Sequence, residues 1–365
     1  MNVLHLISGG ETGGSKNHLL SFIEKCKNEG VYLGVFQEGL LAEEARKRNI
    51  PVVVFNQKSR YDFSILQRIK KEIIEKKINI VHTHGPRANL FTLFLRRMIK
   101  FTWVTTIHSD PEKDFIKGGV KGKVFTAINM HVLKKIDHFF AVSNRFKEML
   151  VRFGIKSEKI TTIYNGIDFD IELTTTISRK QIGLSDEDFV ITMVARLHPI
   201  KGHIIAFEAI HKLVSSGKNV KLLLIGNGPL EDELKKVVQK LQLTDNILFY
   251  GFQEDVHSFL SLSDVKLLAS YSESFPLVIL EAARAYTPVI STDVGGVKDL
   301  ISDPSLGWII NIKNVEELKV AIEEAIILKQ SDKLQQIATN LNKKASEKYS
   351  VDQLVDTILK KYRTL

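Results

Sequence analysis

The feature that most constrains the fold is a regular alternation of short β-branched runs and longer amphipathic segments, which continues through the 365 residues. Helical spacing is clear in Phe63–Lys77, where apolar residues such as Ile65 and Ile69 recur at intervals of three and four. The apolar runs between such segments are typical of parallel strands covered on both faces. The predicted strands are Val3–Ile7, Tyr32–Gln37, Val52–Phe55, Ile80–Thr83, Trp103–Ile107, His138–Val142, Ile160–Ile163, Phe189–Ala195, Val220–Ile225, Ile247–Tyr250, Val265–Ala269, Val289–Ser291 and Gly307–Ile310.

A polar stretch, Asp170–Ser178, interrupts this alternation, which then starts again. A strand–helix pattern repeated in this way predicts an α/β fold with two Rossmann-like domains, each built on a parallel sheet. We place them at residues 1–168 and 169–345, followed by a helical segment at 346–365. Ligands of such sheets bind beyond the carboxyl ends of the strands, so we expect the site in a cleft between the facing domains.

Composition narrows the class of protein. An apolar content of 44% with 25% charged residues is that of a globular chain. The single cysteine, Cys26, cannot form an internal disulfide, the first residues lack a basic segment, and no apolar run approaches the ~18 residues that cross a bilayer. We therefore expect a cytoplasmic protein.

Charge is distributed unevenly along the chain. Residues 1–165 carry 28 Lys and Arg against 15 Asp and Glu, a net charge of +13, whereas the remainder has a net charge of −4. This asymmetry indicates an anionic partner for the first half, such as nucleic acid, a membrane surface or a phosphorylated substrate. A lysine-rich surface that serves only solubility is the alternative.

Glycines follow the first predicted strand at Gly9, Gly10, Gly13 and Gly14. Glycine allows backbone amides at a helix start to approach a phosphate or a sugar. The spacing differs from the G-x-G-x-x-G of dinucleotide-binding proteins, although Glu38 could serve as the acid of such a site. A structural turn is the other interpretation.

Polar residues also end several strands of the first half, at His82–Gly85, Thr106–Ser109 and Ser143–Asn144. His84 and His108 are expected to reach the cleft, although a lone histidine is more often a structural hydrogen-bonding group. The sequence has neither the ligand spacing of a zinc site nor the G-x-S-x-G of a hydrolase, so we expect no metal.

The second half contributes cations and further glycines. Arg196 ends a predicted strand, and Lys201 lies just before the helix predicted at Ile204–Ser215. Two cations beside a helix start can bind a diphosphate, although a solvated surface pair would look the same. Gly226 and Asn227 form a similar turn after the next strand.

The segment ESFPLVILE, from Glu273 to Glu281, is the most informative part of the sequence. Pro276 suits the first turn of a helix that we expect to continue to about Ala285. The unbonded amides of the helix start could then bind phosphates, and the two carboxylates could bind sugar hydroxyls. The segment that supplies these amides consists of Ser274, Phe275, Pro276 and Leu277. Pro276 itself has no N–H to donate.

Together these motifs resemble, in order and over nearly the whole chain, the retaining GT-B glycosyltransferases of family 4. The resemblance rests on the glycine loop, the T-x-H at 106–108, Asn165–Asp168, the Arg196/Lys201 pair and E-x7-E at Glu273 and Glu281. It implies transfer of a sugar from a nucleotide-sugar to a hydroxyl acceptor with retention of anomeric configuration and without a metal or other cofactor. A UDP-sugar is the first candidate for the donor. Ser274 and Pro276 depart from the commoner E-G-F-G form.

The resemblance also implies roles for individual residues. It implies that His108 contacts the donor sugar, that Arg196 and Lys201 neutralise the diphosphate, that Glu273 lies near the transferred sugar and that Glu281 binds the ribose. Gly10 and Gly14 would lie near the donor phosphates and the acceptor, and the C-terminal helix around Val351–Tyr362 would pack on the first domain. Gly226 and Asn227 are further donor-side candidates, and His84, Ser143 and Asn165 are acceptor-side candidates.

The acceptor is predicted from charge. Arg87, Arg96, Arg97 and Lys100 surround Leu90–Leu95, and Lys117, Lys121 and Lys123 flank Phe115, Val120, Val124 and Phe125. Basic residues between large apolar ones favour peripheral contact with an anionic membrane and a glycan or lipid-linked acceptor of cell-envelope or exopolysaccharide synthesis. The alternatives are a sugar-nucleotide epimerase of the same fold and a non-catalytic nucleotide- or nucleic-acid-binding module, although nucleic-acid recognition elements are not evident in the sequence.

Overall fold

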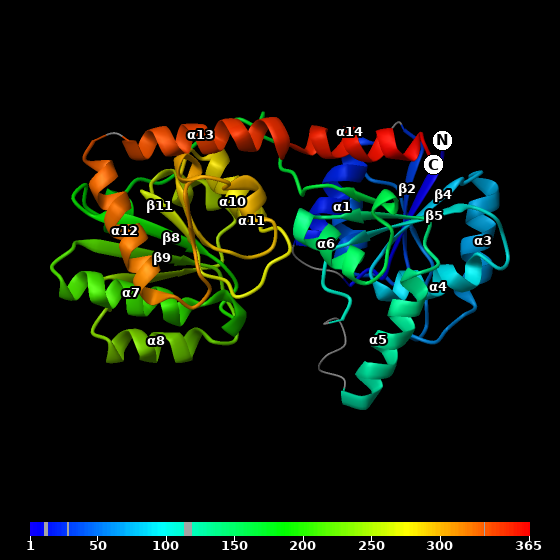
Figure 1. The fold of residues 1–365 in the computed structure, drawn as a ribbon, viewed down its shortest axis with the longest axis horizontal. Coiled ribbons are helices and arrows are strands. Elements are labelled where there is room, and N and C mark those ends of the chain that lie inside the picture. Colours follow the sequence, from blue (N-terminus) through cyan, green and yellow to red (C-terminus); the bar gives the residue numbers. More distant parts are fainter. Residues whose placement is uncertain (11–13, 28, 113–118, 332) are drawn as a thin grey trace. The chain divides into compact units, whose positions relative to one another are not determined.

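The computed structural model describes residues 1–10, 14–27, 29–112, 119–331 and 333–365 (Figure 1). The chain forms two compact units, Met1–Gly166 with Val351–Leu365, and Ile167–Ser350. The sequence placed these boundaries at 168/169 and 345/346, and the structure divides the chain at 166/167 and 350/351.

Unit 1, Met1–Gly166 with Val351–Leu365, contains a seven-stranded parallel sheet in the order β3-β2-β1-β4-β5-β6-β7. Its strands are β1 Val3–Ile7, β2 Val31–Val35, β3 Val52–Val54, β4 Ile80–His84, β5 Thr102–Ile107, β6 His138–Ala141 and β7 Ile160–Thr162. Its helices are α1 Gly14–Lys25, α2 Leu40–Lys47, α3 Ile65–Glu75, α4 Pro86–Leu95, α5 Gly119–Leu133, α6 Asn144–Arg152 and α14 Val351–Tyr362.

The last helix belongs to the core of unit 1, although it lies at the end of the chain. Leu354, Ile358 and Tyr362 of α14 are buried in one cluster with Leu19 and Ile23 of α1. This apolar face on α14 follows from its helical spacing of three and four residues. Burial of such side chains stabilises a fold by roughly 1.5–3 kcal/mol each, so α14 is an integral element of the unit.

Unit 2, Ile167–Ser350, contains a six-stranded parallel sheet in the order β10-β9-β8-β11-β12-β13. Its strands are β8 Phe189–Val194, β9 Val220–Ile225, β10 Ile247–Gly251, β11 Val265–Leu268, β12 Val289–Thr292 and β13 Trp308–Ile310. Its helices are α7 His203–Ser215, α8 Glu231–Lys240, α9 Val256–Ser261, α10 Leu277–Arg284, α11 Val297–Leu300, α12 Val315–Lys329 and α13 Lys333–Lys348.

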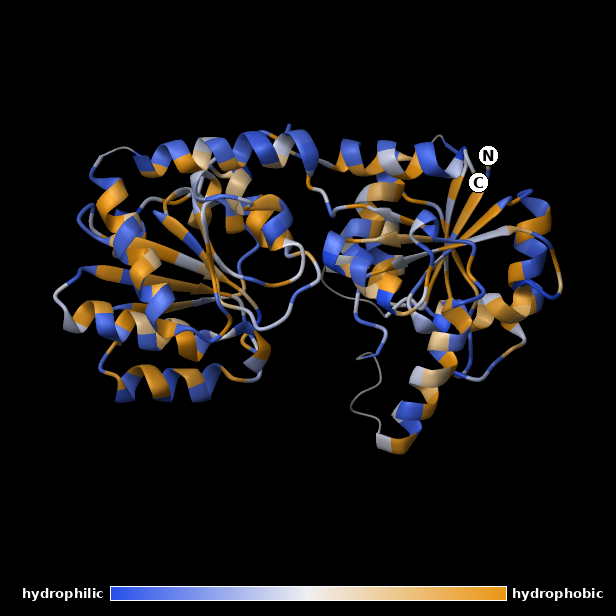
Figure 2. Ribbon diagram, in the orientation of Figure 1, coloured by the Kyte–Doolittle hydropathy of each residue, from blue (hydrophilic) through white to orange (hydrophobic). Residues whose placement is uncertain are grey.

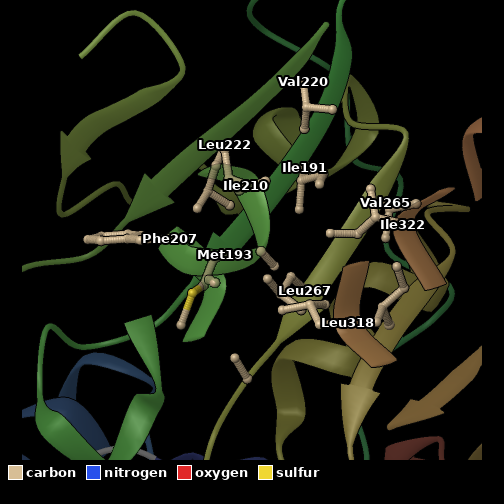
Figure 3. Packing of buried hydrophobic residues seen from close by; sticks show 14 of the residues in the cluster. Ile191, Met193, Phe207, Ile210, Val220, Leu222, Val265, Leu267, Leu318 and Ile322 are labelled. Carbon is tan, nitrogen blue, oxygen red and sulfur yellow. The ribbon is translucent and has the colours of Figure 1, made fainter. Parts of the chain in front are cut away.

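The core of unit 2 lies between this sheet and helices α7 and α12 (Figure 3). Strands β8 and β11 direct alternate residues, such as Ile191 and Leu267, toward this layer. Phe207 from α7 and Leu318 from α12 pack against them. Figure 2 shows the same division, with hydrophobic strands inside each unit and hydrophilic residues on the outer faces of the helices.

Both strand orders reverse direction at one point. In unit 1 the chain builds outward from β1 to β3 and then from β4 to β7, and in unit 2 from β8 to β10 and then from β11 to β13. Loops after the two strands at such a point separate and leave a crevice at the carboxyl ends. The residues after β1 and β4, and after β8 and β11, are therefore the positions where ligands are expected.

The α/β class and both parallel sheets confirm the predicted fold, and the predicted strands all occur, with ends that differ by at most two residues. The prediction for Pro276 was wrong by one position. Pro276 has the extended ψ of 110° of an N-cap residue, and the helix begins at Leu277. In the part of the chain that the structure describes, no helix is both long and apolar enough to cross a bilayer.

Candidate functional site

The site of unit 2 begins where β8 ends. Arg196 is exposed, and Lys201 closes the short 3-10 turn Pro199–Lys201 that precedes α7. Gly202 connects the turn to the helix with φ of 72°, and a Cβ there would lie 2.0 Å from the Ala269 carbonyl oxygen. The sequence thus requires glycine at this position, because the turn packs directly on the end of β11.

The backbone between β11 and α10 is held against the same turn. The Tyr271 N–H donates to the Ile200 carbonyl at 2.7 Å. The Lys201 ammonium donates to Glu273 Oε1 at 2.6 Å, and the two side chains are 24% and 15% exposed. The structure therefore brings these two sequence-predicted residues together as a half-buried ion pair at the switch point of the sheet.

The loop Ser274–Pro276 is fixed by packing and by the backbone. Phe275 is buried and stacks on Tyr349 with ring centroids 5.3 Å apart. The Gly296 N–H donates to the Ser274 carbonyl at 3.0 Å. This rigid loop leads into α10 at Leu277, whose first amides have no partner within the helix and carry the positive end of its dipole.

Glu281 lies in the second turn of α10 and is half-buried. Burial raises the pKa of its carboxyl group, and the nearby Arg284 and Lys266 oppose that shift. Lys266 itself, in β11, has no exposed surface, and its ammonium donates to the Leu267 carbonyl at 2.8 Å. Burial lowers the pKa of Lys266 to about 7, with Glu273 raising it, Lys201 lowering it and Glu281 raising it.

The loop after β9 packs on the loop that carries Arg196. Gly226 has φ of 133°, and a Cβ there would lie 2.2 Å from the Ala195 carbonyl oxygen. The Leu197 N–H donates to the Asn227 carbonyl at 2.9 Å. Gly226 and the exposed Asn227 thus lie beside the loop that carries Arg196.

Unit 1 has a cavity of about 220 Å³ beyond the ends of β4 and β5. His84, Thr106 and His108 line it, together with Asn89 and Asn129. The side-chain oxygen of Asn129 is buried there without a hydrogen-bond partner. Two histidines and two amides around a small cavity suit a ligand with several hydroxyl groups.

The ring of His108 forms a hydrogen bond with that of His84. Its Nε2 lies 3.2 Å from Nδ1 of His84. Burial lowers the pKa of His108 to about 3, and the nearby His18 adds to this shift. The imidazole is therefore neutral at physiological pH and can donate or accept a hydrogen bond without carrying a charge.

The remaining predicted residues of unit 1 are Ser143, Asn165, Gly10 and Gly14. Ser143 is buried and caps α6 by accepting the Phe146 N–H, which is a structural function that the sequence alone did not reveal. Asn165 is buried beyond β7. Gly10 is exposed after β1 and Gly14 begins α1, whereas residues 11–13 of the predicted loop lie outside the described residues.

Comparison with known proteins decides the family. The family model described as glycosyl transferases group 1 matches residues 174–345, and that of Glycosyltransferase Family 4 matches residues 12–171. This chain is a GT-B glycosyltransferase of group 1. The site in unit 2 lies within the first of these two matches.

Individual relatives are distant in sequence, but their similarity covers most of this chain. This chain is 26% identical over 320 residues to N-acetyl-alpha-D-glucosaminyl L-malate synthase of Bacillus anthracis, and the match covers 84% of this chain and 78% of that protein. It is 25% identical to UDP-Gal:alpha-D-GlcNAc-diphosphoundecaprenol alpha-1,3-galactosyltransferase of Escherichia coli, covering 87% and 84%. Anabaena Alr3699/HepE, solved with UDP, has the same fold with a TM-score of 0.88 at 22% identity over the full length of both chains.

Some polar residues inside the strands of this glycosyltransferase were not predicted from the sequence. Lys266 occupies an otherwise apolar strand, and His5 occupies a buried position of β1, next to His82 of the predicted His82–Gly85 segment. A charged or titratable residue at a strand position that must be buried was the available signal. Tyr362, which contacts both histidines, carried no such signal because a tyrosine on an amphipathic helix is ordinary.

Proposed function

We propose that this glycosyltransferase transfers a sugar from a UDP-sugar to a hydroxyl group of a glycan or lipid-linked acceptor with retention of configuration. The observation that carries the proposal is the Lys201–Glu273 pair at 2.6 Å beside the start of α10. It supplies a cation, a carboxylate and a helix N-terminus within one unit, which is the chemistry that a diphosphate attached to a sugar requires. The UDP bound to the structurally similar HepE supports this choice of nucleotide.

In this mechanism the bond between the anomeric carbon and the β-phosphate oxygen breaks on the side from which the acceptor hydroxyl attacks. The new bond forms to the hydroxyl oxygen, and its proton passes to the leaving phosphate. Arg196, Lys201 and the first amides of α10 stabilise the charge that develops on UDP. Glu273 binds the sugar and Glu281 the ribose, so neither carboxylate has to act as a nucleophile.

We further propose that no metal or other cofactor takes part. Two cationic side chains and a helix N-terminus supply the positive charge that a divalent ion would otherwise provide at a leaving diphosphate. Lys201 is bonded to Glu273 in the structure, and binding of a diphosphate would let it share its three N–H donors between the carboxylate and the phosphates. Arg196, being exposed, can join from the solvent side.

The acceptor is proposed to belong to cell-envelope polysaccharide or exopolysaccharide synthesis at the inner face of the membrane. The E. coli relative is named for a lipid-diphosphate acceptor, which supports a lipid-linked substrate here. Val120, Val124 and Ile128 form an exposed apolar stripe along α5, with Lys121 and Lys123 beside it. Figure 1 shows α5 projecting from unit 1, and Figure 2 shows hydrophobic residues along it.

Of the other basic groups predicted for this surface, Arg97 and Lys100 are exposed, whereas Arg87 and Arg96 have partners inside unit 1. Arg96 donates to the Lys135 carbonyl at 2.7 Å and to Asp137 at 2.8 Å. Arg87 donates to Gln57. Most of the apolar side chains of α4 between them face the interior, as Phe91 and Leu95 do. Lys117 and Phe115 lie outside the described residues, so the apolar part of the proposed membrane surface is the stripe on α5.

The donor site is tested by thermal shift with UDP, GDP and ADP, followed by transfer assays. UDP at 100 times its Kd should stabilise the protein by ~2.7 kcal/mol. Lys201→Ala should lower the rate of transfer by about 10²–10³-fold, because it removes charge stabilisation at the leaving group. Lys212→Ala is the matched control, since Lys212 forms an exposed ion pair with Glu316 at the other end of α7.

The product distinguishes the remaining alternatives. Proton NMR of the new glycosidic bond should show the anomeric configuration of the donor, and an inverted product would refute retention. A new sugar nucleotide formed without acceptor would indicate an epimerase. Stabilisation by GDP in place of UDP would reassign the donor, and wild-type activity in Lys201→Ala would refute the phosphate assignment.

A further inference from the structure

A chain of hydrogen bonds crosses the interior of unit 1 from the terminal helix to His108. Tyr362 Oη lies 3.2 Å from His5 Nε2, His5 Nδ1 lies 2.9 Å from His84 Nε2, and His84 Nδ1 lies 3.2 Å from His108 Nε2. A branch joins Tyr362 Oη to His82 Nδ1 and His82 Nε2 to Thr106 Oγ1, the latter at 2.7 Å. Apart from His108, which is partly exposed at the cavity, these side chains are buried.

All four rings of this chain are neutral. Burial lowers the pKa of His5 to about 3 and that of His108 to about 3, and it lowers the pKa values of His82 and His84 well below the ordinary value. Burial also raises the pKa of the Tyr362 hydroxyl well above its usual range. A neutral imidazole has one N–H and one lone pair, so each bond in the chain fixes the direction of the next.

The Tyr362 oxygen could accept from both His82 and His5, but its own buried hydrogen would then lack an acceptor, which costs about 1–3 kcal/mol. Two proton orders satisfy all these bonds and also use that hydrogen. In one, Thr106 donates to His82, His82 to Tyr362, Tyr362 to His5, His5 to His84 and His84 to His108. In the other, every bond is reversed, and the Thr106 hydroxyl accepts from His82. The orders differ at the cavity, because the first leaves an N–H on His108 Nδ1 and the second leaves a lone pair there.

Thr106 selects between the two orders. It is 1% exposed, and among the described residues His82 Nε2 is the partner of its hydroxyl. In the reversed order, the Thr106 hydroxyl hydrogen would be buried without an acceptor, which costs about 1–3 kcal/mol. In the first order its hydrogen is satisfied by His82, and every ring is in the Nδ1–H form.

We propose that this chain holds His108 as a neutral Nδ1–H hydrogen-bond donor, with Tyr362, His82, His5 and His84 as positioning residues. The donor serves an oxygen of the bound sugar or of its leaving phosphate, a role that rests on the proposed glycosyltransfer. His108 therefore acts without gaining or losing a proton. Tyr362, on the last helix of the polypeptide, thus fixes the tautomer of His108 at the cavity.

A metal ion is the alternative occupant of the same cluster. His5, His82 and His84 each have a ring nitrogen within 4.8 Å of those of the other two, a spacing from which three ligands could converge. The direct bond between His5 and His84 already pairs two of these nitrogens, and an ion would have to break it. Zn²⁺ addition is therefore one arm of the test.

The tautomers are read directly by NMR of the full-length protein labelled with ¹⁵N-histidine. The shifts and couplings of the ring nitrogens distinguish Nδ1–H from Nε2–H forms, and His108→Asn assigns the His108 signals. We expect His108 to be Nδ1–H. A His108 in the Nε2–H form, a protonated His108 at neutral pH, or histidine signals lost to one equivalent of Zn²⁺ would each overturn the proposal.

Variants test whether the chain sets this tautomer. Tyr362→Phe removes the link to His5, and Thr106→Val removes the group that selects the order, so in each the His108 signal should become a mixture of both forms. Activity should fall about twofold, in proportion to the remaining competent fraction. Unmixed His108 signals in both variants would refute the chain.

Thr105→Val is the matched control. Thr105 is buried on the same strand, but its hydroxyl donates to the Thr83 carbonyl at 3.0 Å and lies outside the chain. This variant should keep the wild-type tautomer, and a mixed His108 signal in it would refute the specific role of Thr106. Because the NMR readout needs no turnover, failure of the proposed transfer leaves it intact, and an active enzyme with the Nε2–H form would disprove only the present inference.

Discussion

Lys266 places an ammonium group inside β11, within reach of the electrostatic field of Glu273 and Glu281. Its pKa is lowered to about 7 in the folded protein, whereas an unfolded chain keeps the ordinary value of 10.5. Between these values the unfolded state binds more protons, so this residue makes stability rise with pH. The slope approaches about 1.4 kcal/mol per pH unit in that window, so the contribution is lost progressively as pH falls from 10.5 to about 7.

We therefore predict that the free energy of unfolding of the wild type, relative to Lys266→Met, rises between pH 7 and pH 10. Urea denaturation at unit pH intervals measures the difference. Leu268→Met, two residues further along the same strand, is the control without a titratable group, and its difference should not change with pH. A Lys266 difference that is also constant would show that the ammonium keeps its proton.

At this scale, the sequence could predict residues whose chemistry follows from their place at a strand end. Lys201 and Glu273 were found because each follows a predicted strand, and the structure places them 2.6 Å apart. The partners of Tyr362 could not be found, because a contact between residues hundreds of positions apart in the chain depends on sheet order. The hydroxyl of Ser143 likewise became a helix cap only once α6 was fixed.

Elements were more predictable than their contacts. Parallel strands are continuous apolar runs, so their existence could be predicted, whereas the start of α10 could not, since proline is compatible with both N-cap and first-turn positions. The tight packing of loops was hidden as well. Gly295 has φ of 53°, and a Cβ there would lie 2.2 Å from the Ser274 carbonyl oxygen and 2.7 Å from that of Glu273.

We predict that Gly295→Ala displaces the loop that carries Glu273 and weakens UDP binding by at least about tenfold, or 1.4 kcal/mol. Isothermal titration calorimetry measures the affinity. Gly217→Ala is the control, because Gly217 has a similar φ of 79° but nothing within 4 Å of the added Cβ. Both variants should lose about 1–2 kcal/mol of stability through backbone strain, and equal UDP affinity in the two would refute the loop displacement.

At the scale of the whole molecule, the sequence indicated two sheets and an uneven charge, and the structure assigns the terminal helix to unit 1. The resemblance implied that the helix around Val351–Tyr362 packs on the first domain, and the structure confirms it. On the proposed membrane surface, α5, two of the positive charges of residues 1–165, Lys121 and Lys123, adjoin Val120, Val124 and Ile128.

The last prediction concerns that surface and an anionic bilayer. A lysine near such a surface contributes ~1 kcal/mol, and exposed valines gain further free energy when they enter the interface. We expect the protein to sediment with phosphatidylglycerol vesicles at low salt, less at high salt because the charges are screened, and weakly with phosphatidylcholine alone. Val124→Asn should lower the partition coefficient by about tenfold, since ~1.4 kcal/mol of apolar burial is removed.

Val320→Asn is the matched control, because Val320 is 47% exposed on α12 of unit 2, compared with 54% for Val124 on α5. If both variants sediment like the wild type, contact through α5 is refuted while the donor site is unaffected. If both lose binding equally, the attraction is not specific to α5. A loss confined to Val124→Asn means that unit 1 docks through this helix, because electrostatic attraction alone would not distinguish two uncharged substitutions.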